Sequence, residues 1–259
     1  MRNDSFLTGK KVLLTREESD NKEFADLIKK AGGNPLLIPM IGFRPSCLDK
    51  EAKEKLANIT DYDWLILTSK NGVEYFFRQM GETLVLPRVA VIGTKTEKAL
   101  GQYGHVPQFV PSQFVAECFV EEFIPLLHKK SKVLVVKGNL ARNLIAERIE
   151  ENGHTCDEVI LYENVMPEES EEKLCEAIKN EQIDVITFTS SSAVQHFMRV
   201  VEKYSLQSYI SLCVIACIGP IARQTAQAYG LQVHICAEPY TIEGLVAALM
   251  AYQNNNQKS

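Results

Sequence analysis

The sequence repeats itself about half-way along, and this repeat limits the fold more than any other feature of the chain. At an offset of 121 residues, segment 12–16 (VLLTR) aligns with 133–137 (VLVVK), and segment 63–69 (DWLILTS) aligns with 184–190 (DVITFTS). At an offset of 126 residues, 92–93 aligns with 218–219. A repeat at an offset of 121–126 residues predicts two similar lobes with pseudo-twofold symmetry. A cleft between two lobes is a common place for a ligand.

Short apolar runs rich in β-branched residues alternate with helical patterns through both halves. The expected strands are residues 12–15, 36–38, 64–67, 89–92, 108–110, 133–136, 159–161, 185–188, 214–218 and 233–235. Strands separated by helices are typical of βαβ units and parallel sheets. Ten such strands fit two small sheets better than one large sheet. We therefore predict an α/β fold with two similar doubly wound, flavodoxin-like parallel-sheet lobes.

Composition excludes several classes of protein. The 259 residues carry a formal charge of −5, so no global basic field is available for a nucleic acid. No apolar run reaches the ~18 residues of a membrane span, and the first residues lack the apolar core of a secretory signal. The seven cysteines are scattered, which favours a reducing cytoplasm. Five histidines far apart predict no metal site, and neither a P-loop nor a dinucleotide fingerprint is present.

Polar residues stand where expected strands end and helices begin, in two matched pairs. Helix N-termini at this edge of a parallel sheet offer free amide donors and partial positive charge, which suit carboxylate or phosphate. Any one of these residues could be an ordinary helix cap. Four such positions in two symmetric pairs favour an anion-binding cleft. The candidates for binding are Thr68, Ser69, Asn71, Gly93, Thr94, Thr96, Ser190, Ser191 and Gly219.

Three further residues are candidates for the site because of their positions in the repeat. Arg16 and Lys137 occupy matched positions after the first strand of each half, where both could pair with carboxylates or stand as surface cations. Tyr162 occupies the position that Ile41 holds in the other half. A phenol in only one of two similar lobes is what an asymmetric substrate would require. The alternative for Tyr162 is a packing role between the lobes.

The ordered set of motifs resembles the uroporphyrinogen-III synthase family over nearly the whole chain. The segments that carry the resemblance are residues 12–16, 63–73, 91–96, 159–162, 188–194 and 218–220. There are departures from the family pattern. Glu17 stands where a proline is common, Lys137 where an arginine is common, and Ala222 where the second glycine motif commonly has threonine.

The resemblance implies an interlaced organisation joined by two short linkers. Residues 1–41 and 164–259 would form one lobe with both termini, and residues 42–163 the other, with linkers near 41–43 and 162–164. It also implies the reaction, in which hydroxymethylbilane closes to uroporphyrinogen III with inversion of its last pyrrole and loss of water. No metal or organic cofactor would be needed. Tyr162 is then expected to assist hydroxyl departure as a proton or hydrogen-bond donor.

The resemblance also limits the expected partners. We expect a monomer in the cytoplasm that binds the small-molecule substrate hydroxymethylbilane, with neither nucleic acid nor membrane as a partner. A transient contact with the preceding enzyme of the pathway is left open. A second class of function is a non-catalytic two-lobed binding or regulatory domain for a polyanionic small molecule, which the same repeat would suit. A nucleotide-dependent transferase would need a phosphate-binding loop, and the sequence contains no such motif.

Overall fold

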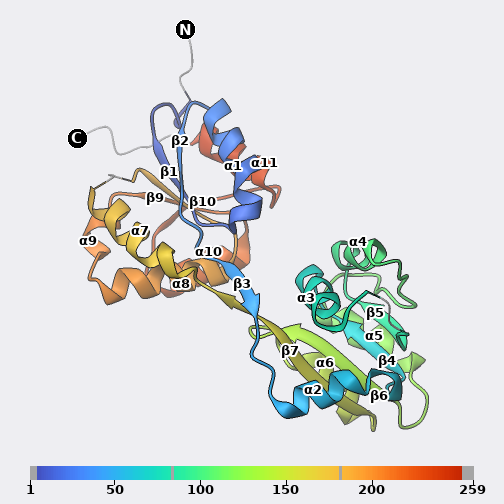
Figure 1. Ribbon diagram of the computed structural model, residues 1–259. Helices are drawn as coiled ribbons and strands as arrows, with labels where there is room; N and C mark the ends of the chain where they lie inside the picture. The colour runs from blue at the N-terminus through green and yellow to red at the C-terminus, as the bar shows by residue number, and fades with distance from the viewer. Residues whose placement is uncertain (1–4, 83–84, 181–182, 253–259) are drawn as a thin grey trace. The chain divides into compact units, whose positions relative to one another are not determined.

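The chain divides into two compact units, each built around its own sheet (Figure 1). The computed structural model describes residues 5–82, 85–180 and 183–252. Unit 1 contains the described residues up to Gly42 and from Val165 onward, and unit 2 runs from Phe43 to Asn164. Unit 1 is therefore made of two chain segments, whereas unit 2 is a single continuous one.

Unit 1 is built on a five-stranded sheet in the order β10-β9-β8-β1-β2. All of its neighbouring strands pair in parallel. Its strands are β1 (Lys11–Leu14), β2 (Asn34–Leu37), β8 (Val185–Phe188), β9 (Val214–Cys217) and β10 (Val233–Cys236). Its helices are α1 (Glu18–Lys30), α7 (Glu168–Asn180), α8 (Ser191–Lys203), α9 (Gln207–Ile210), α10 (Pro220–Ala228) and α11 (Ile242–Ala251).

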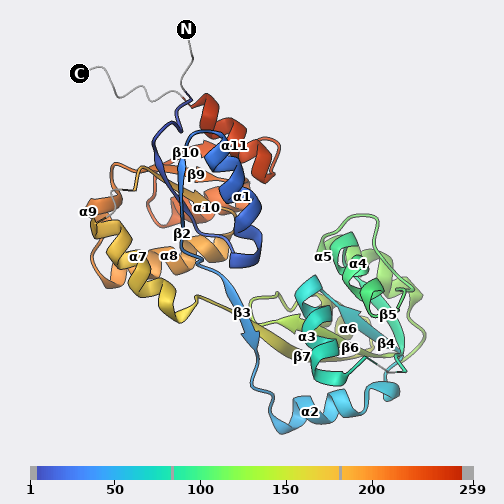
Figure 2. The same cartoon turned by 45° about the horizontal axis from the view of Figure 1, so that its top comes forward.

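Helices cover both faces of this sheet, as Figure 2 shows with α1 and α11 on one side and α7 and α8 on the other. Phe24 and Ile28 of α1 pack with Leu245 of α11 against Val12 and Leu14 of β1. A strand covered on both faces is apolar along its whole length rather than alternating. This is why the short apolar runs of the sequence form the inner strands of the sheet.

Unit 2 has a five-stranded sheet in the order β3-β7-β6-β4-β5. Its strands are β3 (Gly42–Pro45), β4 (Trp64–Leu67), β5 (Arg88–Val91), β6 (Lys132–Gly138) and β7 (Thr155–Val165). Its helices are α2 (Lys50–Ala57), α3 (Lys70–Met80), α4 (Thr94–Gln102), α5 (Ala116–Phe123) and α6 (Leu144–Glu151), with short 3₁₀ turns at Ile59–Asp61 and Ile124–Leu126.

Alternate residues of β4 enter two separate hydrophobic cores in unit 2. Leu65 and Leu67 pack under α2, α3 and α4, whereas Trp64 and Ile66 pack under α5 and α6. Because successive side chains of a strand point to opposite faces, one four-residue run supplies both cores. The predicted α/β class with two parallel-sheet lobes is confirmed.

The repeat of the sequence is a repeat of sheet topology. The strand order β9-β8-β1-β2 of unit 1 corresponds to β5-β4-β6-β7 of unit 2 at the offsets found in the sequence. Equivalent loops therefore leave equivalent strands at the carboxyl edge of each sheet. The two units differ at their outermost strands.

The prediction of a strand over residues 108–110 was wrong in its length. Phe109 forms only an isolated parallel bridge with Ala90 on the outer side of β5, the place that β10 takes in unit 1. Pro107 and Pro111 flank the segment, and proline has no backbone N–H for a longer ladder. The fifth strand of unit 2 is instead β3, which the sequence analysis did not predict. Among the described residues, no helix has both the length and the apolar character needed to cross a membrane.

Candidate functional site

Two serines cap matched helices with nearly identical geometry. Ser69 begins α3 with φ and ψ of −158° and 163°, and Ser190 begins α8 with −158° and 159°. The Ser69 hydroxyl accepts a hydrogen bond from the Gly72 amide at 2.9 Å, and the Ser190 hydroxyl accepts one from Ala193 at 3.2 Å. Each serine follows an inner strand of its own sheet, so the local sequence has produced the same turn twice.

Two glycines begin the next pair of matched helices. Gly93 starts α4 and Gly219 starts α10, and neither helix has a hydrogen bond from a capping side chain. Aromatic side chains that are 126 residues apart pack on these glycines: a Cβ on Gly93 would lie 3.3 Å from Phe114, and one on Gly219 would lie 3.4 Å from Tyr240. The first amides of these helices are therefore not satisfied by a capping side chain, which suits an anionic ligand.

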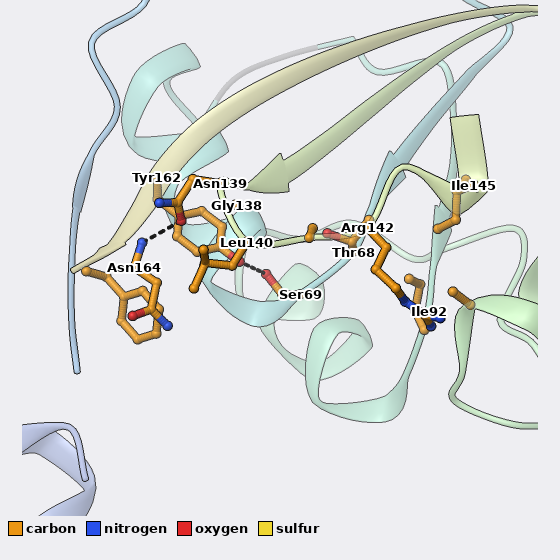
Figure 3. Close-up of a pocket in the computed structure, with 13 residues that line it drawn as sticks. Thr68, Ser69, Ile92, Gly138, Asn139, Leu140, Arg142, Ile145, Tyr162 and Asn164 are labelled. Carbon is orange, nitrogen blue, oxygen red and sulfur yellow. Dashed lines mark hydrogen bonds between the residues drawn. The ribbon is translucent and has the colours of Figure 1, made fainter. Parts of the chain in front are cut away.

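A cavity of about 310 Å³ lies at the carboxyl edge of the unit 2 sheet (Figure 3). It is formed where β4, β6 and β7 end, together with the loop that follows β6. The residues that line it are Phe43, Thr68, Ser69, Ile92, Ala116, Gly138, Asn139, Leu140, Ala141, Arg142, Ile145, Tyr162 and Asn164. Its wall is mainly apolar with a few polar groups, which is typical of small-molecule sites.

Tyr162 is held on several sides within this cavity. Its hydroxyl lies 2.9 Å from the Ser69 hydroxyl, and its side chain is largely buried (Figure 3). The ring stacks on Tyr75 with centroids 5.5 Å apart, and Phe43 meets it edge-on at 5.6 Å. These contacts fix where the phenol oxygen lies, and Tyr162 is one of the residues that line the cavity.

Gly138 is the residue that makes room for this ring. A Cβ at position 138 would lie 2.5 Å from Cζ of Tyr162 and 2.8 Å from its hydroxyl oxygen. Non-bonded carbons prefer about 3.5–4.0 Å, so the Tyr162 ring occupies space that any side chain at 138 would fill.

The environment of Tyr162 keeps its phenol protonated. Burial raises the pKa of Tyr162 above its ordinary value of 10.0, and the hydrogen bond with Ser69 only partly opposes this. The Ser69 oxygen accepts from the Gly72 amide, and its hydroxyl also has one proton that it can donate to the Tyr162 oxygen. In that arrangement the phenol proton is available to a ligand in the cavity.

The loop after β6 is tied to β7 by backbone and amide contacts. The Asn139 amide donates to the Tyr162 carbonyl at 3.1 Å, and Asn139 Oδ1 accepts from the Asn164 amide at 2.8 Å (Figure 3). Asn164 Oδ1 is buried and has no hydrogen-bond partner within the described part of the chain. It is therefore an acceptor that a donor group on a ligand could satisfy.

Arg142 supplies the basic side chain at the wall of the cavity. Its guanidinium makes two contacts with Glu117, at 2.6 and 3.2 Å, and both side chains are more than half exposed. Exposed ion pairs contribute little to stability, because water and salt screen the two charges. A ligand carboxylate could therefore replace Glu117 on the guanidinium.

A known protein family matches this chain across both of its units. The sequence model of one family, described as "Uroporphyrinogen-III synthase HemD", matches residues 22–247. This match extends over both units. The chain belongs to the uroporphyrinogen-III synthase family.

Curated relatives of this synthase family agree with the match. A protein of Synechococcus elongatus named uroporphyrinogen-III synthase is 29% identical over 251 residues, which cover 94% of this chain and 95% of that one. A protein of Ruminiclostridium josui named "Porphyrin biosynthesis protein HemD" is 27% identical over 256 residues. The match covers 96% of this chain and 50% of the R. josui protein, so the chain spans about half the length of that relative.

Solved uroporphyrinogen III synthases share the fold. The Thermus thermophilus enzyme, as a mutant, superposes with a TM-score of 0.63 at 16% identity, covering 92% of this chain and 96% of that one. The Helicobacter pylori enzyme gives 0.61 at 17% identity, with coverages of 93% and 97%. At these identities the likeness supports the fold alone.

The structure brings some of the predicted synthase residues together and places others apart. Thr68, Ser69 and Tyr162 share the unit 2 cavity. Asn71, Gly93 and Thr94 belong to the same unit but do not line that cavity. The predicted residues of unit 1 follow three adjacent strands, at the carboxyl edge of its sheet. Arg16 follows β1, Ser190 and Ser191 follow β8, and Gly219 follows β9.

Two predicted residues lie inside unit 2 rather than at its surface. The Lys137 ammonium is buried and donates to Glu158 and to Asn143, both at 2.7 Å. It therefore supports the cavity loop through Asn143 at the start of α6. Thr96 is also buried, like its counterpart Ala222, so the departure at Ala222 changes the interior of a unit and not its surface.

The sequence analysis missed the residues that the loop after β6 contributes to the cavity. Gly138, Asn139 and Arg142 all line the cavity, yet none was predicted. One signal was available, because Gly138 is matched in the repeat by Glu17 as Tyr162 is matched by Ile41. In the part of the chain that the structure describes, no group of three His, Cys, Asp or Glu side chains could hold a metal ion.

Proposed function

We propose that the chain is a uroporphyrinogen-III synthase that cyclises hydroxymethylbilane, inverts the terminal pyrrole and releases water. The observation that carries this proposal is the family match over residues 22–247, which extends across both units. The cavity around Tyr162 supports the proposal, because it combines a protonated phenol with an apolar wall and one guanidinium.

Substrate binding rests on amides and hydroxyls rather than on many fixed charges. Hydroxymethylbilane carries eight carboxylates, and the chain as a whole is acidic. We assign carboxylate binding in unit 2 to the starts of α3 and α4, with Thr68, Ser69, Asn71, Gly93 and Thr94, and in unit 1 to Arg16 and the starts of α8 and α10, with Ser190, Ser191 and Gly219. Helix N-termini bind anions through free N–H groups and the helix dipole.

Tyr162 acts at the step that breaks the carbon–oxygen bond. Its phenol donates a proton to the departing hydroxyl, which leaves as water and creates an azafulvene cation. The substituted carbon of the terminal pyrrole attacks that cation to form a spiro intermediate, which reopens and recloses with this ring inverted. The inverted pyrrole loses the proton of its attacked carbon as it regains aromaticity, and this proton restores the phenol, so atoms and charge balance.

Most of the rate enhancement comes from holding the two ends of the linear tetrapyrrole in contact. Positioning of reacting groups can lower a barrier by as much as about 7–11 kcal/mol. A general acid adds about a hundred- to ten-thousandfold, and less when its pKa lies far from the working pH. Tyr162 is therefore an assisting group in a site that works mainly by orientation.

Partners and compartment follow from the same proposal. We expect a monomer that works in the cytoplasm without a metal or organic cofactor, bound neither to nucleic acid nor to membrane. All seven cysteines are free thiols, which suits a reducing compartment. A transient contact with the enzyme that supplies hydroxymethylbilane stays a prediction.

Analysis of product isomers tests the proposed function. The purified chain would receive freshly generated hydroxymethylbilane, and the products would be oxidised and separated by chromatography. We expect the type III isomer in excess over a control without protein, in which the spontaneous type I ring forms. Type I alone, with tetrapyrrole bound to the chain, would instead indicate a non-catalytic binding domain.

A further inference from the structure

Two matched positions of the repeat change together between the units. Position 162 is tyrosine where unit 1 has Ile41, and position 138 is glycine where unit 1 has Glu17. In unit 2 these residues are register partners on adjacent strands, because β6 and β7 pair Gly138 with Tyr162. The unit that has the phenol is thus also the unit that lacks a side chain opposite it.

A register shift in the sheet creates this pairing. Lys137 pairs with Ile160, but the next residue, Gly138, pairs with Tyr162, so Leu161 is an extra residue on β7. Such bulges re-aim a side chain and are over-represented beside active sites. Without the shift, Gly138 would face Leu161 and the phenol ring would leave the strand elsewhere.

We propose that Gly138, together with this register shift, positions the Tyr162 hydroxyl for hydroxyl departure. The inference rests on the proposed function, and it assigns Gly138 as a positioning residue that does not itself contact the reacting atoms. Its contribution is the absence of a side chain. A Cβ at 138 would lie 2.5 Å from Cζ of Tyr162 and 2.6 Å from Cε2.

The ring has little freedom to escape such a clash while keeping its contacts. Tyr75 stacks on it, Phe43 meets it edge-on, and Ser69 binds its hydroxyl. The backbone at 138 is held as well, because the next amide, that of Asn139, donates to the Tyr162 carbonyl. A methyl group at 138 must therefore move the phenol oxygen away from Ser69.

Kinetics of a double-mutant cycle test this role. We expect Gly138→Ala to lower kcat by roughly ten- to a thousandfold, as Tyr162→Phe does, with KM changed less than about threefold. The double variant should lose no more than the worse single variant, because both remove the same correctly placed hydroxyl. Gly101→Ala is the matched control, since nothing lies within 4 Å of a Cβ there, and its kcat should equal that of the wild type.

Stability of the same positions gives a test that needs no activity. Gly138→Ala should lower the melting temperature of the wild type but have little effect in a Tyr162→Ala background, where the ring is gone. This cycle also decides the matter if Gly138→Ala alone does not fold. Equal effects of Gly138→Ala in the two backgrounds would overturn the inference.

The outcomes separate this inference from the proposed function. A wild type that makes no type III product contradicts the proposed function and, with it, any role of Gly138 in hydroxyl departure. An active wild type together with an undiminished kcat for Gly138→Ala overturns the inference alone. Multiplying losses in the double variant would also overturn it, because they would show that Gly138 acts independently of Tyr162.

Discussion

Tyr162 is a weak acid in surroundings that favour its neutral form. Burial of the ring raises the pKa of the phenol above 10.0, and Tyr75 beside it acts in the same direction. At any given pH, a phenol with a raised pKa is protonated to a larger extent than an ordinary tyrosine. The phenol is therefore a donor throughout the neutral and mildly alkaline range.

This shift predicts the pH dependence of turnover. Because the pKa of Tyr162 lies above 10.0, any alkaline decline of kcat that comes from this group should have its midpoint above pH 10. The check is kcat against pH for the wild type and for Tyr162→Phe. An alkaline limb with a midpoint near pH 8 that is present in the wild type and absent in Tyr162→Phe would contradict the assignment.

Arg142 offers a second prediction for a single residue. Its guanidinium pairs with Glu117 at the cavity, and we expect it to exchange this partner for a substrate carboxylate. Arg142→Gln should raise KM about three- to tenfold, because the variant loses one charged contact with the substrate, with a smaller change in kcat. Arg148→Gln is the matched control, because Arg148 forms a comparable exposed pair with Glu151 on α6. An equal KM in both variants would exclude Arg142 from binding.

At the scale of elements, the starts of α3 and α8 form a natural pair for comparison. Ser69→Ala and Ser190→Ala each remove a cap, and each should lower the free energy of unfolding by about 0.5–2 kcal/mol in denaturant titrations. Ser69→Ala should in addition lower kcat, since it removes the hydrogen bond to Tyr162. The loss of kcat should be smaller in Ser190→Ala. Equal kcat values would mean that the bond between Ser69 and Tyr162 does not matter for turnover.

The sequence pattern predicted most elements because local chemistry decides them. The buried run at 64–67 and the serine that follows it contain both the strand and the cap of the next helix. β3 could not be found in this way, because Gly42–Pro45 has little β propensity and joins the sheet only through β7. The short pairing of 108–110 had a local cause that the sequence analysis did not use, namely Pro107 and Pro111 on either side of the segment.

The candidate site shows the same division between local and non-local causes. Ser69 and Ser190 were predicted from strand ends, and Tyr162 from its mismatch with Ile41. Gly138 and Asn139 became visible only when β6 was placed between β4 and β7. Lys137 was expected at a ligand, but its burial against Glu158 follows from its place inside the sheet.

At the scale of the whole molecule, the division of the chain predicts how it folds. Unit 2 is one continuous segment with a hydrophobic core on each face of its sheet. A fragment of residues 42–165, which includes the full β3 and β7 strands, should therefore fold alone and unfold cooperatively. Circular dichroism during thermal and urea unfolding checks this. A fragment without a cooperative transition would show that unit 2 depends on unit 1 for its stability.

The most direct test of the account is single-turnover kinetics of Tyr162→Phe with analysis of product isomers. The variant keeps the ring and its packing but has no proton to donate to the departing hydroxyl. We predict a rate roughly ten- to a thousandfold below the wild type, with type III still the isomer that the enzyme forms. A variant that turns over as fast as the wild type would contradict the central claim and remove Tyr162 from the mechanism.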